Sequence, residues 1–224
     1  MSEKRYLDYD GLQELVLKIK EYIGDAGKLE FKGTVADVAH LPTLTEQKVG
    51  WMYTVAYEFQ RRFKGVEINK VLTIEASGIA IATMLGNLYD VPVVFAKKDQ
   101  TANSTDDKYM SQAYSFTHKT VNNVFVSKPY LHATDKVLVV DDFLADGEAV
   151  HALADLVHQA GGEVVGVGIA VEKGHQKGGK MLREEGYHLE SIAIIEEMDY
   201  ETQTIRFREQ PPKDLGNTQI GLKA

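Results

Sequence analysis

Short apolar runs alternate with amphipathic stretches along most of the sequence after Trp51, and this alternation limits the possible folds more than any other feature. The apolar runs have strand length and are mostly rich in β-branched residues; they cover residues 71–74, 91–96, 136–140, 164–171 and 191–195. The stretches with helical spacing cover residues 51–63, 77–88, 147–160 and 180–185. Apolar strands that alternate with helices predict an α/β fold in which a parallel sheet is flanked by helices on both faces.

The loops that follow the predicted strands are expected to lie along one edge of this sheet. They begin after Ile74, Ala96, Val140 and Val171, which are the carboxyl ends of parallel strands. Sheets of this kind bind ligands at that edge. The polar residues of these loops are therefore the candidates for a functional site.

The two ends of the chain have a different pattern. Residues 10–23 have helical spacing, with Asp10 as the N-cap and Gly24 as the stop, whereas residues 28–50 are turn-rich and predict one or two short strands. The tail after Gln210 is polar, begins with two prolines and is predicted to be extended. We therefore divide the chain into an N-terminal helix with short strands (1–54), a core (55–210) and a tail (211–224).

The composition excludes several classes of function. Lys and Arg total 25 against 33 Asp and Glu, a net charge of −8, so the chain lacks the basic excess of a nucleic-acid-binding protein. The absence of cysteine excludes disulfides, thiolate catalysis and cysteine metal sites. No apolar run has membrane-spanning length and the start lacks a signal-peptide pattern, which predicts a soluble, cytoplasmic protein.

The most informative segment is residues 137–150, VLVVDDFLADGEAV. An apolar strand ends in Asp141 and Asp142, and a short loop of small residues leads through Gly147 into a helix. Backbone N–H groups of such a loop can approach a phosphate closely, and the helix N-terminus adds partial positive charge. Two adjacent carboxylates can accept hydrogen bonds from neighbouring sugar hydroxyls. An isolated Asp-Asp pair would more often be a solvated turn, but this order of elements predicts a ribose phosphate site.

Residues 137–150 resemble the motif that binds 5-phosphoribosyl 1-diphosphate (PRPP) in type I phosphoribosyltransferases. Residues 57–209 more widely resemble the bacterial xanthine phosphoribosyltransferases of purine salvage, in the segments TIEASGIA, VPVVFAKK, YSFT, DDFLA, QAGGEVVGVGIAVEK and YETQTIRFREQ. The resemblance implies the type I phosphoribosyltransferase fold, a homodimer, and Mg²⁺ bound together with PRPP. It also implies the conversion of xanthine and PRPP to xanthosine 5′-monophosphate and pyrophosphate.

The same resemblance implies a role for individual residues. Asp141 and Asp142 are the implied catalytic residues, which hold the ribose hydroxyls and stabilise developing positive charge. The implied PRPP-binding residues are Glu75, Ala76, Ser77, Gly78 and Lys97 at the diphosphate and Ala145, Asp146, Gly147, Glu148 and Ala149 at the 5′-phosphate. Lys173 is implied to bind the purine base, with Glu172 orienting its surroundings. No dedicated protein ligand is implied for Mg²⁺, because diphosphate oxygens and water can hold it.

Some of these segments also fit plainer interpretations when they are considered alone. Residues 73–80 fit a helix N-cap with a turn glycine, and Lys97 fits an exposed strand end. The polar residues 99–126 predict a long loop, which in the family closes over PRPP and excludes water. Asp146 and Glu148 place two acids beside a dianion, where the family more often has neutral residues, so the sequence predicts weaker PRPP binding than in such relatives.

Residues 1–54 depart from the family pattern, because the motifs of the small hood that covers the base are missing. Residues 29–55 instead resemble short segments of phage structural proteins, which indicates a fusion joined near residues 51–56. Two alternative functions therefore stay open. One is a PRPP-sensing regulator, although residues 1–54 lack the clustered basic residues of a DNA-binding module. The other is a structural or assembly protein with a non-catalytic phosphoribosyltransferase-like domain.

Overall fold

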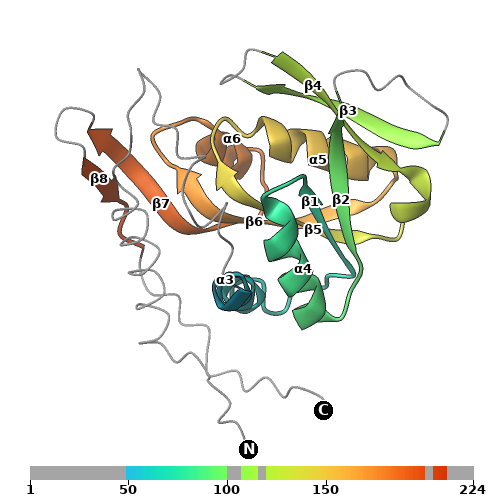
Figure 1. Ribbon diagram of the computed structural model, residues 1–224, viewed down its shortest axis with the longest axis horizontal. Coiled ribbons are helices and arrows are strands. Elements are labelled where there is room, and N and C mark those ends of the chain that lie inside the picture. Colours follow the sequence, from blue (N-terminus) through green and yellow to red (C-terminus); the bar gives the residue numbers. More distant parts are fainter. Residues whose placement is uncertain (1–48, 100–106, 116–119, 200–203, 211–224) are drawn as a thin grey trace, which may run out of the picture.

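The computed structural model describes residues 49–99, 107–115, 120–199 and 204–210, which form one eight-stranded sheet covered by helices (Figure 1). The strand order is β3-β4-β2-β1-β5-β6-β7-β8. The strands are β1 Lys70–Ile74, β2 Val93–Asp99, β3 Lys108–Ser115, β4 Thr120–Ser127, β5 Lys136–Leu144, β6 Glu163–Lys173, β7 Leu189–Asp199 and β8 Thr204–Phe207. The five strands from β2 to β7 in this order are parallel, as predicted, while β3, β4 and β8 make antiparallel pairs at the two sides.

Helices cover both faces of the sheet. They are α3 Val49–Arg62, α4 Gly78–Tyr89, α5 Glu148–Gln159 and α6 Gly178–Glu184, with a short 3₁₀ helix η2 at Lys128–Tyr130. Figure 1 shows α3 and α4 on one face and α5 and α6 on the other. Each face has its own apolar cluster, the first built around Phe59, Phe63 and Leu85 and the second around Leu153 and Leu156. β1 and most of β5 and β6 are buried between the two layers, which explains their continuous apolar runs in the sequence.

Two predictions about this part of the chain need correction. Much of the stretch 99–126, predicted to be a loop, is the hairpin of β3 and β4, with Lys108 paired to Ser127 and Ser115 to Thr120. Its strands are too polar to be recognised from an apolar pattern, and they are held instead by β2 and by α5. Gln159 on α5 accepts a hydrogen bond from the Met110 N–H (3.3 Å) and donates one to the Met110 carbonyl (2.7 Å). The short strand β8 was also not predicted.

The outer parts of the chain lie mostly beyond the described residues. The predicted helix at 10–23, residues 28–48 of the turn-rich stretch 28–50 and the tail 211–224 therefore stay predictions. Residues 49 and 50, the end of that stretch, lie in a helix instead. α3 begins at Val49 and runs across the predicted domain boundary at 54, with Met52 and Val55 both buried in the core. Among the helices of the described ranges, none combines the length and the apolar character needed to cross a lipid bilayer.

A buried ion pair joins β1 to the turn before β5. Lys70 and Asp135 are each only 7% exposed, and the Lys70 Nζ lies 2.5 Å from an Asp135 carboxylate oxygen. We expect Asp135→Ala to lower the free energy of unfolding by about 3 kcal/mol, because it leaves a buried ammonium without its counter-charge. Urea unfolding measures this. Glu67→Ala is the control, because Glu67 is an exposed partner of Lys136 and its loss should have no measurable effect.

Candidate functional site

Two adjacent acids lie in the last part of the central strand β5. Asp141 and Asp142 are 6% and 7% exposed, and β5 continues past them to Leu144. Their oxygens accept hydrogen bonds from the next backbone N–H groups, Asp142 N at 2.9 Å from Asp141 and Phe143 N at 2.8 Å from Asp142. Neither acid has an ion-pair partner within 4 Å among the described residues. The protein thus holds two buried carboxyl groups side by side without an ion-pair partner among the described residues.

This arrangement perturbs Asp141. Burial raises the pKa of Asp141 well above its ordinary value of 3.8, the adjacent Asp142 carboxylate raises it further, and the positive charge of Lys98 partly opposes the rise. A buried carboxylate that lacks a counter-charge destabilises the folded protein when it is ionised. Such a site is suited to a ligand that brings hydrogen-bond donors or positive charge.

The raised pKa of Asp141 predicts a pH-dependent effect of Asp141→Asn on stability. The contribution of the Asp141 side chain to the stability of the folded protein is fully present below pH 3.8. It is lost as the pH rises through the pKa that Asp141 has in the folded protein. Asparagine cannot ionise, so the variant should melt a few degrees above the wild type at pH 7, and the difference should shrink as the pH falls toward 4. Thermal unfolding followed by circular dichroism across this range measures it. Asp155→Asn, which changes an exposed acid on α5, should show no such trend.

The turn between β1 and α4 lies directly beside Asp141. A Cβ atom added to Gly78 would lie 2.1 Å from Thr73 Oγ1 and 3.0 Å from Asp141 Oδ1, so only glycine fits here. The peptide bond between Glu75 and Ala76 is cis. Ser77 occupies the N-cap position of α4, but its side chain makes no capping hydrogen bond. The plainer interpretation, a helix N-cap with a turn glycine, thus places Ser77 correctly, but the Ser77 hydroxyl does not cap the helix.

The side chain of Glu75 has a structural role. Its Oε1 accepts a hydrogen bond from the Lys98 N–H at 2.6 Å, and its own N–H donates to the Ala96 carbonyl at 3.0 Å. Both bonds tie the turn after β1 to β2. What this turn can offer a ligand is thus its backbone and the Ser77 hydroxyl, in agreement with the predicted use of backbone N–H donors.

The two lysines of β2 differ in their relation to the acids. Both are exposed, and β2 continues through them, pairing Lys97 with Phe125 and Lys98 with Val124. Successive strand residues point to opposite faces, so only one of them can face Asp141. The positive charge of Lys98 lowers the pKa of Asp141 and so partly opposes its rise. The predicted role of Lys97 at the diphosphate stays a prediction.

The loop between β5 and α5 contains the predicted 5′-phosphate site. Gly147 has a φ of +90° and is the N-cap of α5, so no side chain covers the first N–H groups of that helix. Ala145, Asp146, Glu148 and Ala149 are each partly exposed. Free N–H groups at the start of a 12-residue helix form an anion-binding position.

The end of β6 brings a further cation and a buried acid to the same edge. Lys173 is the last residue of β6, and its Nζ lies 6.0 Å from the ring centroid of Phe143, the residue that follows the acid pair. Glu172 is 2% exposed and accepts two hydrogen bonds from Arg183 (2.8 and 2.7 Å). Burial favours a higher pKa of Glu172, but hydrogen bonds from Arg183 and Ser191 outweigh it and hold the pKa below its usual range.

The predicted residues therefore come together at the carboxyl edge of β1, β5 and β6, with β2 beside them. Residues missed by sequence reasoning are Thr73, Lys98, Gly178 and Arg183. Thr73 is fully buried and its hydroxyl has no hydrogen-bond partner among the described residues. His151 lies at the surface beside Glu185, with His151 Nε2 2.6 Å from Glu185 Oε2.

The surroundings of Asp141 and Asp142 can be compared with what a divalent cation requires. The described residues contain no cluster of three or more His, Asp or Glu side chains able to hold a metal alone. Two buried carboxylates without counter-charge would be stabilised by positive charge carried on a ligand. The residues at this edge thus fit Mg²⁺ that arrives coordinated by phosphate oxygens and water.

Comparison with known proteins gives a consistent result. A family model described as the phosphoribosyl transferase domain matches residues 55–201. A xanthine phosphoribosyltransferase from Bifidobacterium adolescentis is 55% identical over 147 residues, which cover 65% of this chain and 76% of that protein. A xanthine phosphoribosyltransferase from Alkaliphilus metalliredigens is 42% identical over 195 residues, covering 84% of this chain and 92% of that protein.

The Alkaliphilus match is longer than residues 55–224 can supply, so the similarity extends into the segment before residue 55. This observation bears on the predicted fusion, which stays a prediction. Among solved structures, adenine phosphoribosyltransferase from Rhodothermus marinus matches with a TM-score of 0.63 at 19% identity, covering 79% of this chain and 99% of that one. At this identity the likeness concerns the fold alone.

Proposed function

The chain belongs to the phosphoribosyltransferase family, and we propose that it transfers the phosphoribosyl group of PRPP to xanthine, giving xanthosine 5′-monophosphate and pyrophosphate. The choice of xanthine rests on relatives named as xanthine phosphoribosyltransferases at 42–55% identity. The observation that carries the proposal is the buried pair Asp141 and Asp142, located between the turn at Gly78 and the loop at Gly147.

Each part of PRPP has a matching part of this edge. The 5′-phosphate binds the N–H groups of the loop from Ala145 to Ala149 at the start of α5. The ribose hydroxyls donate to Asp141 and Asp142. The diphosphate meets the backbone of the turn from Glu75 to Gly78, with Lys97 or Lys98 supplying positive charge. This order runs along one edge of the sheet, as a single extended ligand requires.

Transfer needs little covalent chemistry from the protein. The bond from C1′ to the diphosphate oxygen breaks with its electrons on the oxygen, and a ring nitrogen of the base bonds to C1′ and loses its proton to solvent. Positive charge develops on the ribose while the bonds exchange, and the ionised acid pair stabilises that charge. Lys173 donates to an exocyclic oxygen of the base and orients it. Mg²⁺ bound with PRPP would be held by diphosphate oxygens and water rather than by protein side chains, and it would supply positive charge at the leaving group.

We also propose that the protein acts as a homodimer in the cytoplasm, as the family resemblance implies. Asp146 and Glu148 do not prevent PRPP binding, because both are partly exposed and their charges are screened by water.

Pyrophosphate release tests the function directly. The protein is incubated with Mg²⁺ and PRPP together with xanthine, guanine, hypoxanthine or adenine in turn, and we expect the largest kcat/KM with xanthine. Preference for another purine would overturn the base assignment. PRPP binding without release for any base would favour the regulatory alternative. Absence of PRPP binding with large assemblies in light scattering would favour the structural alternative.

A further inference from the structure

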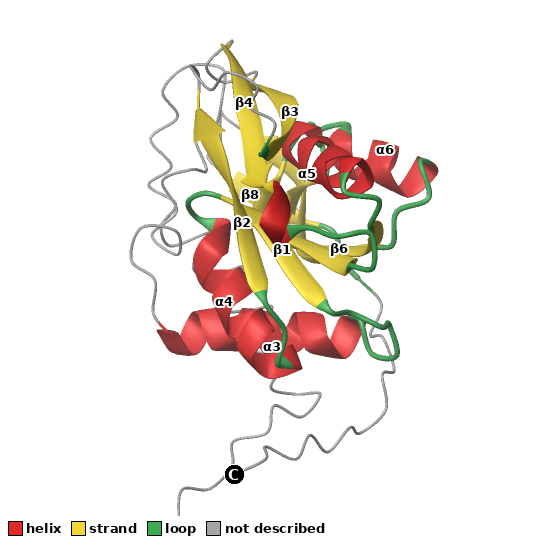
Figure 2. Ribbon diagram, turned by 90° about the vertical axis from the view of Figure 1, so that its right-hand side faces the viewer, coloured by secondary structure: helices red, strands yellow, loops and turns green. Residues whose placement is uncertain are grey.

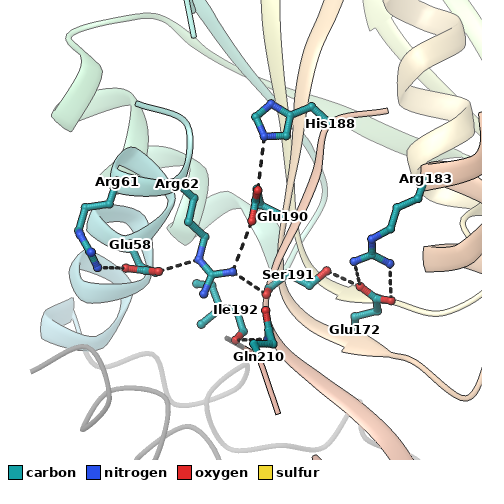
Figure 3. Close-up of polar contacts among 10 residues, drawn as sticks. All are labelled: Glu58, Arg61, Arg62, Glu172, Arg183, His188, Glu190, Ser191, Ile192 and Gln210. Atoms are coloured by element: carbon teal, nitrogen blue, oxygen red, sulfur yellow. Dashed lines mark hydrogen bonds and ion pairs between the residues drawn. The ribbon is translucent and has the colours of Figure 1, made fainter. Parts of the chain in front are cut away.

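An ion pair between the buried Glu172 and Arg183, whose side chain is 38% exposed, fastens α6 to the end of β6, next to Lys173. Arg183 donates to both carboxylate oxygens of Glu172 in a fork (Figure 3). Its Nη1 also donates to the Gly179 carbonyl at 3.0 Å. The fork holds the guanidinium and the carboxylate in one relative orientation, which a single hydrogen bond does not do. α6 is therefore oriented by the end of the strand that carries Lys173.

The first turn of α6 contacts the two binding segments through consecutive glycines. A Cβ on Gly178 would lie 2.3 Å from the Ala145 carbonyl oxygen and 2.6 Å from the Gly147 nitrogen. A Cβ on Gly179 would lie 2.0 Å from Glu172 Oε1. The Gly178 N–H also donates to the Ala145 carbonyl at 3.0 Å. α6 thus fills the space between the loop at Gly147 and the end of β6, and Figures 1 and 2 both show it beside α5.

Glu172 is itself held from the side opposite Arg183. The Ser191 hydroxyl donates to Glu172 Oε2 at 2.5 Å, and Arg62 on α3 donates to the Ser191 carbonyl at 2.8 Å. Arg62 is fixed in turn by Glu58, which is 2% exposed and lies 2.6 Å away (Figure 3). This chain of contacts runs from α3 across β7 to α6, so Glu172 is a fixed point in the core rather than a surface acid.

We propose that Glu172 and Arg183 are positioning residues that set the distance between the base-binding Lys173 and the 5′-phosphate loop, with α6 as the rigid connector. The inference rests on the proposed function, since it requires that Lys173 binds the base and the loop binds the phosphate. A nucleotide that contacts both places gains affinity only when their spacing is correct. A ligand that contacts the phosphate loop alone does not depend on that spacing.

The test compares two ligands on matched variants. Xanthosine 5′-monophosphate reaches both places, whereas ribose 5-phosphate reaches the loop and the acid pair only. Binding of each is measured by calorimetry for the wild type, Arg183→Gln, the double variant Glu172→Gln with Arg183→Gln, and Lys180→Gln. Lys180 is the control, because it lies on α6 with its side chain 79% exposed. Melting temperatures are recorded for all four proteins.

We expect Arg183→Gln to weaken nucleotide binding about tenfold more than ribose 5-phosphate binding, and Lys180→Gln to change neither. Arg183→Gln also leaves Glu172 buried and unpaired, so its melting temperature should fall. The double variant removes both charges, so its melting temperature should return to that of the wild type. Its ratio of affinities, nucleotide relative to ribose 5-phosphate, should stay as low as in Arg183→Gln. Equal weakening of the two ligands, or recovery of the ratio in the double variant, would show a purely structural role and would overturn the inference.

The wild type separates the failure of this inference from failure of the proposed function. If the wild type releases pyrophosphate with xanthine but the ratio of affinities is unchanged in Arg183→Gln, only the positioning role is wrong. If the wild type binds ribose 5-phosphate but no purine nucleotide, both proposals are wrong. Arg183→Lys adds a conservative variant, which keeps the charge without the fork and should give an intermediate ratio.

Discussion

Replacing both Asp141 and Asp142 by asparagine will abolish turnover while the protein stays folded. The two side chains are buried at the end of β5 and have no ion-pair partner within 4 Å among the described residues, so their charge is available to the reacting ribose. Removing both takes away the negative charge that stabilises the transition state, and kcat/KM should fall by about 1,000-fold or more. Pyrophosphate release measures the rate, and circular dichroism the folded state.

Stability gives this prediction a built-in control. Asparagine is close in shape to aspartate, and the loss of buried like charges should raise the melting temperature at neutral pH, as for Asp141→Asn alone. Lower activity in a more stable protein cannot result from unfolding. Full activity in the double variant would refute the catalytic role. The single variants then divide the effect between the two acids.

Gly78→Ala should have the second largest effect, with kcat/KM for PRPP falling about 100-fold. The added methyl group would meet Thr73 Oγ1 at 2.1 Å and Asp141 Oδ1 at 3.0 Å. Thr73 is fully buried and cannot move aside, so the turn or Asp141 must shift. Either shift moves the predicted diphosphate contacts relative to the ribose contacts. Steady-state kinetics with varied PRPP measures the change.

Gly86→Ala is the matched control for this experiment. Gly86 lies on the same helix, and a Cβ there would meet Val93 Cγ2 at 2.2 Å, a comparably close contact but one away from Asp141. Both variants should lose stability, because each forces a methyl group into a packed position. Only Gly78→Ala should lose kcat/KM per folded molecule, assayed below both melting temperatures. A similar loss in both variants would mean that the effect of Gly78→Ala is general destabilisation.

The succession of elements, and the position of the segment proposed to bind PRPP, follow from the sequence alone. Apolar runs with helical stretches between them predict the central parallel strands, and each predicted strand from 71–74 to 191–195 overlaps an observed one. The loop after Val140 is recognisable because an anion site at a helix start needs small residues, and a diol site needs acids, within a few positions of each other. These requirements are local, so local sequence contains them.

The hairpin of β3 and β4 and the short strand β8 could be identified only from the tertiary structure. Their strands are short or have apolar positions interrupted by polar residues, and they are held by pairing with β2 and β7 and by contact with α5. The sequence also does not show on which face of the sheet Lys97 and Lys98 each lie, because that depends on how β2 pairs with its neighbours. A strand's register and face are set by its neighbours, which periodicity within the strand does not identify.

The acid pair at the end of β5 was determined by the sequence, and its surroundings were decided by the tertiary structure. That Asp141 and Asp142 follow an apolar run can be read directly from the sequence. Their burial without a counter-charge depends on the packing of β1, α4 and β6 around them. The pairing of Glu172 with Arg183 and Ser191, and of Arg62 with a carbonyl 129 positions away, depends on strand order. Contacts between distant residues arise only when the sheet assembles, because their partners share no local pattern.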